Sequence, residues 1–231
     1  MTLAAVFCDF DGTISRRDVG YNLFHHFSGG KNDALLPDWK AGRLSTRDCL
    51  RQEAAMVRAS EEEVYAFLKQ FELNRGFDEF VTLCRAQDID LQVISDGLDF
   101  YINHLLKRFG LQQLSVTANR GRLTDGGLVI EFPHDNRHCR RCGSCKGERI
   151  DEYRRNLSPD KVVAFVGDGY SDVCAVTEAD IVFAKKDLEE YCRISNIAFH
   201  QYDDFYDVAR KLVGLGFMKS ESTNTLDGVR E

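Results

Sequence analysis

The fold of this chain is decided by the stretch Leu3-Ala4-Ala5-Val6-Phe7-Cys8-Asp9-Phe10-Asp11-Gly12-Thr13. A continuous apolar run changes abruptly to acidic and small residues, as a buried parallel strand does where it ends in a loop. The same pattern recurs at 91–97 and 162–169, and a shorter apolar run covers 181–184. Because helical patterns separate these runs, we predict an α/β fold with a doubly wound parallel sheet and helices on both faces.

The segment 15–78 differs from the rest because it is charged and helical in pattern, for example at 61–68 after Ser60, a typical helix cap residue. We therefore expect a small helical cap inserted after the first strand, with linkers near Ser15 and Gly76. Residues 1–14 and 79–218 would form the catalytic core.

Two further segments complete the expected organisation. Alternating apolar residues on either side of Asp125-Gly126-Gly127 predict a β-hairpin over 114–132. The last residues, 219–231, are polar without periodicity, and we expect a disordered tail.

Charge and hydropathy limit the class of partner. The chain has 231 residues, with 30 basic and 37 acidic residues and a net charge of −7, which argues against binding to a nucleic-acid backbone. No apolar stretch approaches the roughly 18 residues that span a bilayer, and the N-terminus has no basic leader, so we expect a cytoplasmic protein without a membrane partner. The sequence does not specify an oligomeric state.

The cysteines fall into two groups. Five of them stand singly in apolar or helical stretches and are expected to be buried thiols: Cys8, Cys49, Cys84, Cys174 and Cys192. The other three, Cys139, Cys142 and Cys145, have a spacing that suits a structural Zn²⁺ site, with His134 or His138 as a fourth ligand. A reduced thiol cluster that shapes the loop, or a labile disulfide between Cys139 and Cys142, remains an alternative.

Carboxylates follow two of the predicted strands. Asp9 and Asp11 suit a division of labour in which one attacks phosphorus and the other handles the proton of the leaving group, while Gly12 lets the backbone approach a phosphate. Asp168 and Asp172 add hard oxygen ligands of the kind that Mg²⁺ prefers. The carboxyl ends of parallel strands share one edge of a sheet, so these loops are expected to converge. Each segment alone could also be an ordinary acidic turn.

Two more residues could bind a phosphoryl group. Ser95 follows an apolar strand and can donate its hydroxyl to a phosphoryl oxygen, supported by the Gly97 amide, although it could also simply cap a helix. Lys146 follows the clustered cysteines and could orient the nucleophile and neutralise the phosphoryl group, although most lysines are solvated surface residues.

The joint pattern Asp-x-Asp-Gly-Thr, Ser, Lys and Gly-Asp-Gly-x-Ser-Asp, over about residues 1 to 185, resembles the haloacid dehalogenase superfamily of phosphatases. The resemblance implies a Rossmann-like core and an aspartyl-phosphate intermediate in the hydrolysis of a small phosphorylated metabolite. It makes Asp9 the nucleophile and Asp11 the general acid and base. Ser95 and Lys146 would bind the phosphoryl group. The implied Mg²⁺ ligands are Asp9, Asp11 and Asp168, with Asp172 in support.

The position of the helical insertion resembles the phosphoserine-phosphatase branch, and Asp18 matches the acidic position that contacts the substrate amino group there. Glu53 stands where that branch has an arginine for the substrate carboxylate, which argues against phosphoserine. The segments 142–146, 183–188 and 202–206 resemble more closely the family of 2-hydroxy-3-keto-5-methylthiopentenyl-1-phosphate phosphatases of methionine salvage. Phosphoserine, phosphocholine and phosphoethanolamine phosphatases, transfer to an acceptor other than water, and a non-catalytic phosphate-binding module remain alternatives.

Overall fold

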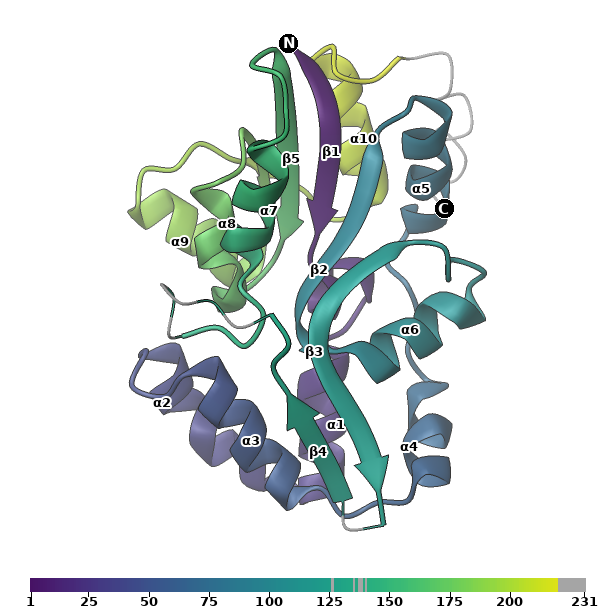
Figure 1. The fold of residues 1–231 in the computed structure, drawn as a ribbon, viewed down its shortest axis with the longest axis vertical. Coiled ribbons are helices and arrows are strands. Elements are labelled where there is room, and N and C mark those ends of the chain that lie inside the picture. Colours follow the sequence, from purple (N-terminus) through teal and green to yellow (C-terminus); the bar gives the residue numbers. More distant parts are fainter. Residues whose placement is uncertain (126, 135, 137–138, 140, 220–231) are drawn as a thin grey trace.

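The computed structural model describes residues 1–125, 127–134, 136, 139 and 141–219. Its centre is a single sheet with the strand order β4-β3-β2-β1-β5-β6-β7 (Figure 1). The strands are β1 (Thr2–Cys8), β2 (Asp90–Leu98), β3 (Ser115–Thr124), β4 (Gly127–Glu131), β5 (Lys161–Gly167), β6 (Ile181–Ala184) and β7 (His200–Gln201). All neighbours pair in parallel except β3 and β4, so the predicted α/β fold is confirmed.

Helices alternate with the strands along most of the chain. The α helices are α1 (Val19–Ser28), α2 (Leu36–Lys40), α3 (Thr46–Met56), α4 (Glu61–Leu68), α5 (Phe77–Ala86), α6 (Asp99–Arg108), α7 (Lys146–Arg154), α8 (Val173–Val176), α9 (Lys186–Ile194) and α10 (Phe205–Gly214). Three short helical turns are η1 (Phe10–Ile14), η2 (Lys31–Leu35) and η3 (Tyr170–Asp172).

The two faces of the sheet are covered by different helices because side chains alternate along each strand. Val6 and Cys8 of β1 lie in an apolar core with residues of α5, α6 and α10. Ala5 and Phe7 of the same strand lie in a second core with residues of α7, α8 and α9. The sheet is therefore buried on both faces, which explains why its central strands are continuously apolar in sequence.

β1 lies between β2 and β5, and the strand order reverses there. Cys8 pairs with Val93 on one side and with Val166 on the other, so the loops after these strands open at the same edge. Such a switch point is where ligands bind in open α/β sheets.

The predicted hairpin is confirmed: β3 and β4 pair antiparallel, with Thr124 opposite Gly127. Residue 126 of the predicted turn lies outside the described residues. β4 packs against α3, so the hairpin extends beyond the core to the helices of segment 15–78 (Figure 1).

The segment 15–78 contains α1 to α4, and we refer to it as the cap segment. Its two connections to the core run side by side, because Ser15 and Leu73 form an isolated antiparallel bridge. The amide of Asn74 also donates to the carbonyl of Ile14 at 2.7 Å. Ser60 caps α4 as predicted, with its hydroxyl accepting from the Glu63 amide. Two adjacent connections of this kind suit a hinge.

The C-terminal part of the described chain ends on α5. The Lys219 amide donates to the side chain of Gln87 at 2.8 Å. The rest of the tail for which we expect disorder, 220–231, lies outside the described residues. Among the residues that are described, none of the helices is both long and apolar enough to cross a membrane.

Candidate active site

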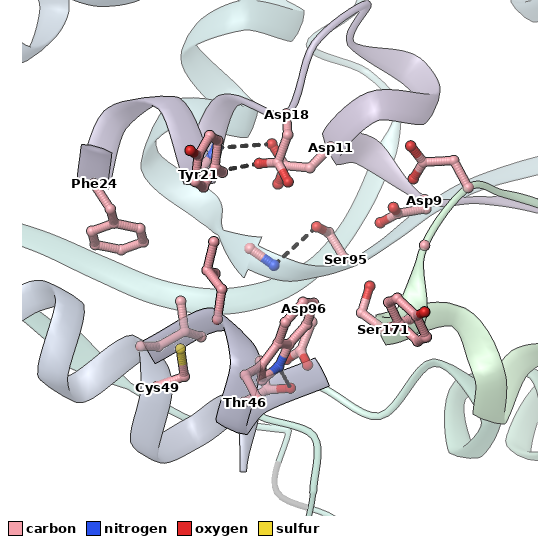
Figure 2. A pocket seen from close by; sticks show the side chains of 18 of the residues that line it. Asp9, Asp11, Asp18, Tyr21, Phe24, Thr46, Cys49, Ser95, Asp96 and Ser171 are labelled. Carbon is pink, nitrogen blue, oxygen red and sulfur yellow. Dashed lines mark hydrogen bonds between the residues drawn. The ribbon is translucent and has the colours of Figure 1, made fainter. Parts of the chain in front are cut away.

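A cavity of about 410 Å³ opens at the carboxyl edge of the sheet, between the core and the cap segment (Figure 2). Its size suits a small metabolite. Loops of the core supply mostly charged and polar groups to its wall, namely Asp9, Asp11, Ser95, Asp96, Gly97, Asp168, Ser171 and Lys186. The cap segment supplies a wall of apolar and acidic side chains with one basic side chain, which includes Asp18, Tyr21, Phe24, Leu36, Trp39, Lys40, Thr46, Cys49, Leu50 and Glu53.

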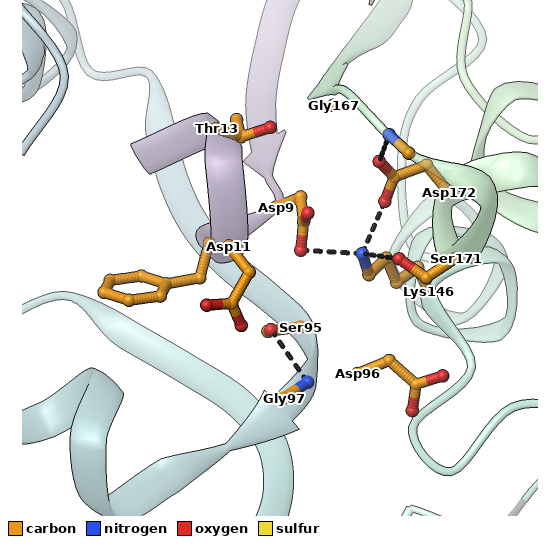
Figure 3. A network of polar contacts seen from close by, with 12 residues as sticks. Asp9, Asp11, Thr13, Ser95, Asp96, Gly97, Lys146, Gly167, Ser171 and Asp172 are labelled. Carbon is orange, nitrogen blue, oxygen red and sulfur yellow. Dashed lines mark hydrogen bonds and ion pairs between the residues drawn. The ribbon is translucent and has the colours of Figure 1, made fainter. Parts of the chain in front are cut away.

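The floor of the cavity is an ion-pair network around Lys146 (Figure 3). Lys146 Nζ lies 2.7 Å from Asp9 Oδ1, contacts Asp172 Oδ1, and donates to Ser171 Oγ at 3.2 Å. Lys146 is only 1% exposed, so it is not the solvated surface residue that we kept as the alternative. Burial lowers the pKa of Lys146, but Asp172 and Asp9 raise it by more, so the lysine stays charged.

Lys146 and Asp172 stand behind the cavity wall rather than in it. The Asp172 side chain is fully buried, and its Oδ2 accepts from the backbone amides of Asp168 and Gly169 at 2.9 Å each. Asp172 therefore fixes the loop after β5 and the ammonium of Lys146. Asp9 is the carboxylate of this network that faces the cavity (Figure 3).

Asp11 is held by donors from two directions. Its Oδ1 accepts from the backbone amides of Val19 at 2.8 Å and Gly20 at 3.1 Å, at the start of α1. Its Oδ2 accepts from the hydroxyl of Tyr101, a buried residue of α6, at 2.5 Å. Burial raises the pKa of Asp11 in spite of these hydrogen bonds, so the carboxyl can hold a proton closer to neutral pH than an ordinary aspartate.

Two glycines permit close approaches in this wall. Gly12 has φ +76°, and a Cβ there would lie 2.3 Å from Asp168 Oδ2. A Cβ on Gly97 would lie 2.0 Å from the Tyr101 hydroxyl and 2.5 Å from Asp11 Oδ2. Both positions therefore need glycine to keep the carboxylates where they are.

The loop after the Ser95 strand differs from expectation. β2 continues through Gly97 to Leu98, and the N-cap of α6 is Leu98, so Ser95 does not cap this helix. Ser95 Oγ accepts from the Gly97 amide at 3.0 Å and lines the cavity. Its position fits the phosphoryl-binding role, while the helix-cap alternative is wrong.

Two residues of this region were missed in the sequence. Asp96 Oδ1 accepts from the backbone amides of Gly143 at 2.9 Å and Ser144 at 2.7 Å, which ties the loop before α7 to β2. Lys186 Nζ lies 2.7 Å from Asp168 Oδ2. The Lys186 backbone has φ +50°, a conformation that few residues other than glycine adopt, and no sequence motif signals it.

The cap segment contributes two carboxyl groups to the cavity, and that of Asp18 lies beside Asp11 (Figure 2). Asp18 is the N-cap of α1, where its Oδ1 accepts from the Tyr21 amide at 2.7 Å, and enclosure in the cavity and the charge of Asp11 raise its pKa. Glu53 of α3 is 6% exposed and accepts from the Asn32 side chain at 3.2 Å. Burial raises the pKa of Glu53 to about 7. The wall of the cap segment is therefore acidic or neutral at Glu53, while Lys40 of α2 is its basic residue and pairs with Asp187 at 3.1 Å.

The clustered cysteines lie directly before Lys146. The Sγ atoms of Cys139, Cys142 and Cys145 lie within 4.8 Å of one another. Cys174 of α8 joins them, 4.0 Å from Cys142 and 3.8 Å from Cys145 between Sγ atoms. The prediction of Cys174 as an isolated buried thiol is wrong; the other four singly placed cysteines are buried as expected. His138, considered as a zinc ligand, lies outside the described residues.

The structure thus places Asp9, Asp11, Asp18, Ser95, Gly97 and Asp168 at one cavity, with Gly12, Lys146 and Asp172 packed behind it. Carboxylate oxygens of Asp9, Asp168 and Asp172 lie within 4.8 Å of one another, as in a site for a divalent cation. Asp9 follows β1, Asp168 and Asp172 follow β5, and Ser95 and Gly97 lie at the end of β2. Their convergence supports the expectation drawn from the sequence pattern.

Comparison with known proteins agrees with this geometry. The chain is 29% identical over 211 residues to the 2-hydroxy-3-keto-5-methylthiopentenyl-1-phosphate phosphatase of Bacillus cytotoxicus, covering 90% of this chain and 94% of the relative. It is 28% identical to the protein of the same name from Bacillus pumilus, covering 88% of each chain. These relatives span nearly the whole described fold.

Solved structures show the same fold at lower identity. A substrate-bound phosphoserine phosphatase has a TM-score of 0.69 at 17% identity, covering 93% of this chain and 99% of that one. The family hydrolase t0658 from Salmonella enterica serovar Typhi has a TM-score of 0.72 at 18% identity, covering 95% and 73%. The model of the haloacid dehalogenase-like hydrolases matches residues 6–176, which include the carboxyl ends of β1, β2 and β5. The chain belongs to the family of haloacid dehalogenase-like hydrolases.

Proposed function

We propose that this hydrolase is a Mg²⁺-dependent phosphomonoesterase that cleaves a small phosphorylated metabolite with Asp9 as its nucleophile. The observation that carries the proposal is the buried Lys146, whose Nζ lies 2.7 Å from Asp9 Oδ1 behind a cavity of metabolite size. A lysine at that position orients Asp9 and favours its ionised, nucleophilic form against the opposing effects of burial and Asp172. The relatives named above are phosphatases, which supports the same reaction class.

The reaction divides between the two carboxyls of the first loop. An oxygen of Asp9 attacks phosphorus, the bond between phosphorus and the ester oxygen breaks, and Asp11 gives its proton to the departing alkoxide. Asp11 then takes a proton from water, whose oxygen attacks the phosphorus of the aspartyl phosphate. Inorganic phosphate leaves and Asp9 is regenerated. Tyr101 and the amides of Val19 and Gly20 hold Asp11 in place for both proton transfers.

The donor set fits Mg²⁺. Asp9 and Asp168 are hard oxygen donors at the cavity, and Asp11 belongs to the same loop as Asp9. Burial and the negative charge of Asp172 raise the pKa of Asp9, in spite of Lys146, so the cluster has an excess of negative charge. Because both Asp172 oxygens are engaged by Lys146 and backbone amides, we assign Asp172 a supporting role. The bound ion would supply positive charge that offsets the phosphate dianion.

We infer a substrate without a carboxylate. Glu53 and Asp18 stand on the wall of the cap segment and offer a substrate carboxylate no positive charge, and Lys40, the basic residue of that wall, is already paired with Asp187. Phe24, Leu36 and Leu50 add apolar surface that suits a thioether or alkyl tail. 2-Hydroxy-3-keto-5-methylthiopentenyl 1-phosphate has this character, and the names of the relatives support it.

An amino-alcohol phosphate is the second candidate, because the same two carboxyls, Asp18 and Glu53, could receive an ammonium group. Phosphoethanolamine and phosphocholine have such a group and no carboxylate. Phosphoserine has both, so its carboxylate would meet Glu53.

The test is phosphate release from these four esters with Mg²⁺, using Asp9→Asn as the blank and circular dichroism to confirm its fold. We expect the methylthiopentenyl ester to have the highest kcat/KM, and chelator to abolish turnover until Mg²⁺ is restored. Preference for an amino ester selects the second candidate. Turnover by Asp9→Asn, or full activity in chelator, refutes the mechanism, and absence of Asp9-dependent release from every ester favours a non-catalytic phosphate-binding module. Adding hydroxyl acceptors to the assay distinguishes transfer from hydrolysis.

A further inference from the structure

Four thiols from two distant segments meet beside Lys146. Cys139, Cys142 and Cys145 belong to the loop before α7, and Cys174 belongs to α8. The Sγ atoms are 3.5 Å apart for Cys139 and Cys142, 4.0 Å for Cys142 and Cys174, and 3.8 Å for Cys145 and Cys174. None of these four cysteines is in a disulfide.

Three of the six separations among these sulfurs are thus close to the edge of a zinc–sulfur tetrahedron, and Cys139, Cys142 and Cys145 all lie within 4.8 Å of one another. Zinc binds thiolate sulfur at about 2.3 Å, so neighbouring sulfurs of a four-thiolate site lie about 3.8 Å apart. A disulfide needs about 2.05 Å, and one disulfide would use only two of the four thiols. Cys174 closely approaches Cys142 and Cys145, and rotation of the half-buried Cys139 side chain toward the same centre completes the fourth corner.

Hydrogen-bond donors of the protein reach two sulfurs of the cluster. The Gly147 amide donates to Cys174 Sγ at 3.4 Å. Cys145 Sγ receives the backbone amide of Glu148 and the side chain of Asn136. Cys145 also immediately precedes α7, so the positive end of that helix faces the cluster. Donors of this kind commonly support ligating sulfur from the outer shell.

We propose that Cys139, Cys142, Cys145 and Cys174 bind one Zn²⁺ ion, and that this ion holds Lys146 in its position beside Asp9. The fourth ligand is thus Cys174 in place of the histidine considered from the sequence. Cys145 immediately precedes Lys146, and Cys174 lies two residues beyond Asp172. The ion therefore clamps together the two segments whose side chains form the network under Asp9.

Asp96 provides a second attachment for the loop before α7. The same loop, at Gly143 and Ser144, donates two backbone amides to Asp96 Oδ1. The loop before α7 is therefore attached to β2 through Gly143 and Ser144, and to α8 through the cysteines on either side of them. Both attachments directly precede Lys146, which is only 1% exposed.

The first test measures metal, not turnover. Protein purified under reducing conditions without chelator should contain about one zinc per chain by mass spectrometry, and Co²⁺ replacement should give the visible spectrum of a tetrahedral four-thiolate ion. Cys174→Ser should weaken zinc binding by at least roughly tenfold, as loss of a ligand or its support does. Cys174→His keeps a zinc ligand and should retain the metal, while Cys192→Ala is the matched control elsewhere in the fold.

A wild-type protein that takes up no zinc when reduced and supplied with the ion overturns the proposal. So does a Cys174→Ser protein that binds zinc as tightly as the wild type with an unchanged Co²⁺ spectrum. If Cys174→Ser fails to fold, the Cys174→His protein decides, because its Co²⁺ spectrum must change to that of three sulfurs and one nitrogen. These outcomes are independent of whether the ester assay succeeds.

The positioning role rests on the proposed function and has its own test. Zinc removal at saturating Mg²⁺ should lower kcat at least roughly tenfold in the wild type. Such a loss corresponds to about 1.5 kcal/mol or more, the contribution of one hydrogen bond to a charged group. In a Lys146→Met protein the residual kcat should be the same with and without zinc, because the residue that the ion positions is gone. An equal fold-loss in both proteins refutes the positioning role while leaving the metal site intact.

Discussion

Replacing Glu53 by glutamine should change how the stability of the protein depends on pH. Glu53 is 6% exposed and accepts a hydrogen bond from Asn32, which the carbonyl oxygen of glutamine can also accept. Burial raises its pKa from the ordinary 4.5 to about 7. Between those values the unfolded chain releases the proton of Glu53 while the folded protein retains it, so the wild type loses stability as pH rises through this window.

The size of the effect follows from the shift. Each pKa unit corresponds to about 1.4 kcal/mol, so the raised pKa costs the wild type about 3 kcal/mol of unfolding free energy between pH 4.5 and pH 8. Below pH 4.5 the side chain is protonated in both states, and above pH 8 the loss is complete. Glu53→Gln lacks the ionisation, so it should be more stable than the wild type at pH 8, by at most this amount.

Urea unfolding by circular dichroism at pH 5, 6, 7 and 8 measures the effect directly. The difference between the two free energies reports the ionisation of Glu53 together with its electrostatic effect on Asp18, whose pKa the Glu53 charge raises. Glu62→Gln, which removes an exposed carboxyl of α4, is the control and should follow the wild type at every pH. Parallel curves for the wild type and Glu53→Gln between pH 5 and 8 would refute the reasoning.

Three further changes test the core of the site. Tyr101→Phe removes a hydrogen bond to Asp11 worth about 1.5–3 kcal/mol, so kcat/KM should fall roughly 10- to 100-fold. Because that hydrogen bond lowers the pKa of Asp11, its loss should move the pH–rate profile to higher pH. An unshifted profile contradicts the role assigned to Tyr101. Gly97→Ala should cost about 1–3 kcal/mol in urea unfolding and most of the activity, whereas Gly214→Ala, with open space around it, should not destabilise. Lys40→Ala removes the exposed ion pair of 3.1 Å between Lys40 of α2 and Asp187. The free energy of unfolding should change by less than about 1 kcal/mol, and KM should rise by up to roughly fivefold at constant kcat. An unchanged KM argues against a role of this ion pair in closing the cap segment over the cavity.

The positions of the acidic loops were predictable because buried parallel strands have a strong local signal. Asp9 and Asp168 follow continuous apolar runs, and the strand ends agree with the expected ones within a residue. The end of β2 differs from the expected one. Residues Ser95 to Gly97 are polar and small, yet they still belong to the strand. Backbone pairing there depends on the neighbouring strand, which local composition does not report.

The missed residues share a different cause. Tyr101 is 90 positions from Asp11, and on an amphipathic helix its pattern is that of an ordinary core aromatic. Cys174 stands alone in sequence and joins the other cysteines only after α8 packs against α7. Lys186 depends on a backbone conformation that no motif marks. Contacts of high sequence separation are set by tertiary packing, so a single sequence could not reveal them.

The two amides that hold Asp11 belong to the first turn of the cap segment, whereas Tyr101 belongs to the core. On the proposed hinge at Ser15 and Leu73, opening withdraws Val19 and Gly20 and leaves Asp11 with the tyrosine alone. Because these amides lower the pKa of Asp11, closure of the cap segment would make Asp11 the stronger acid. On the proposed mechanism, proton transfer to the leaving group would then be favoured once the cavity is shut over an ester.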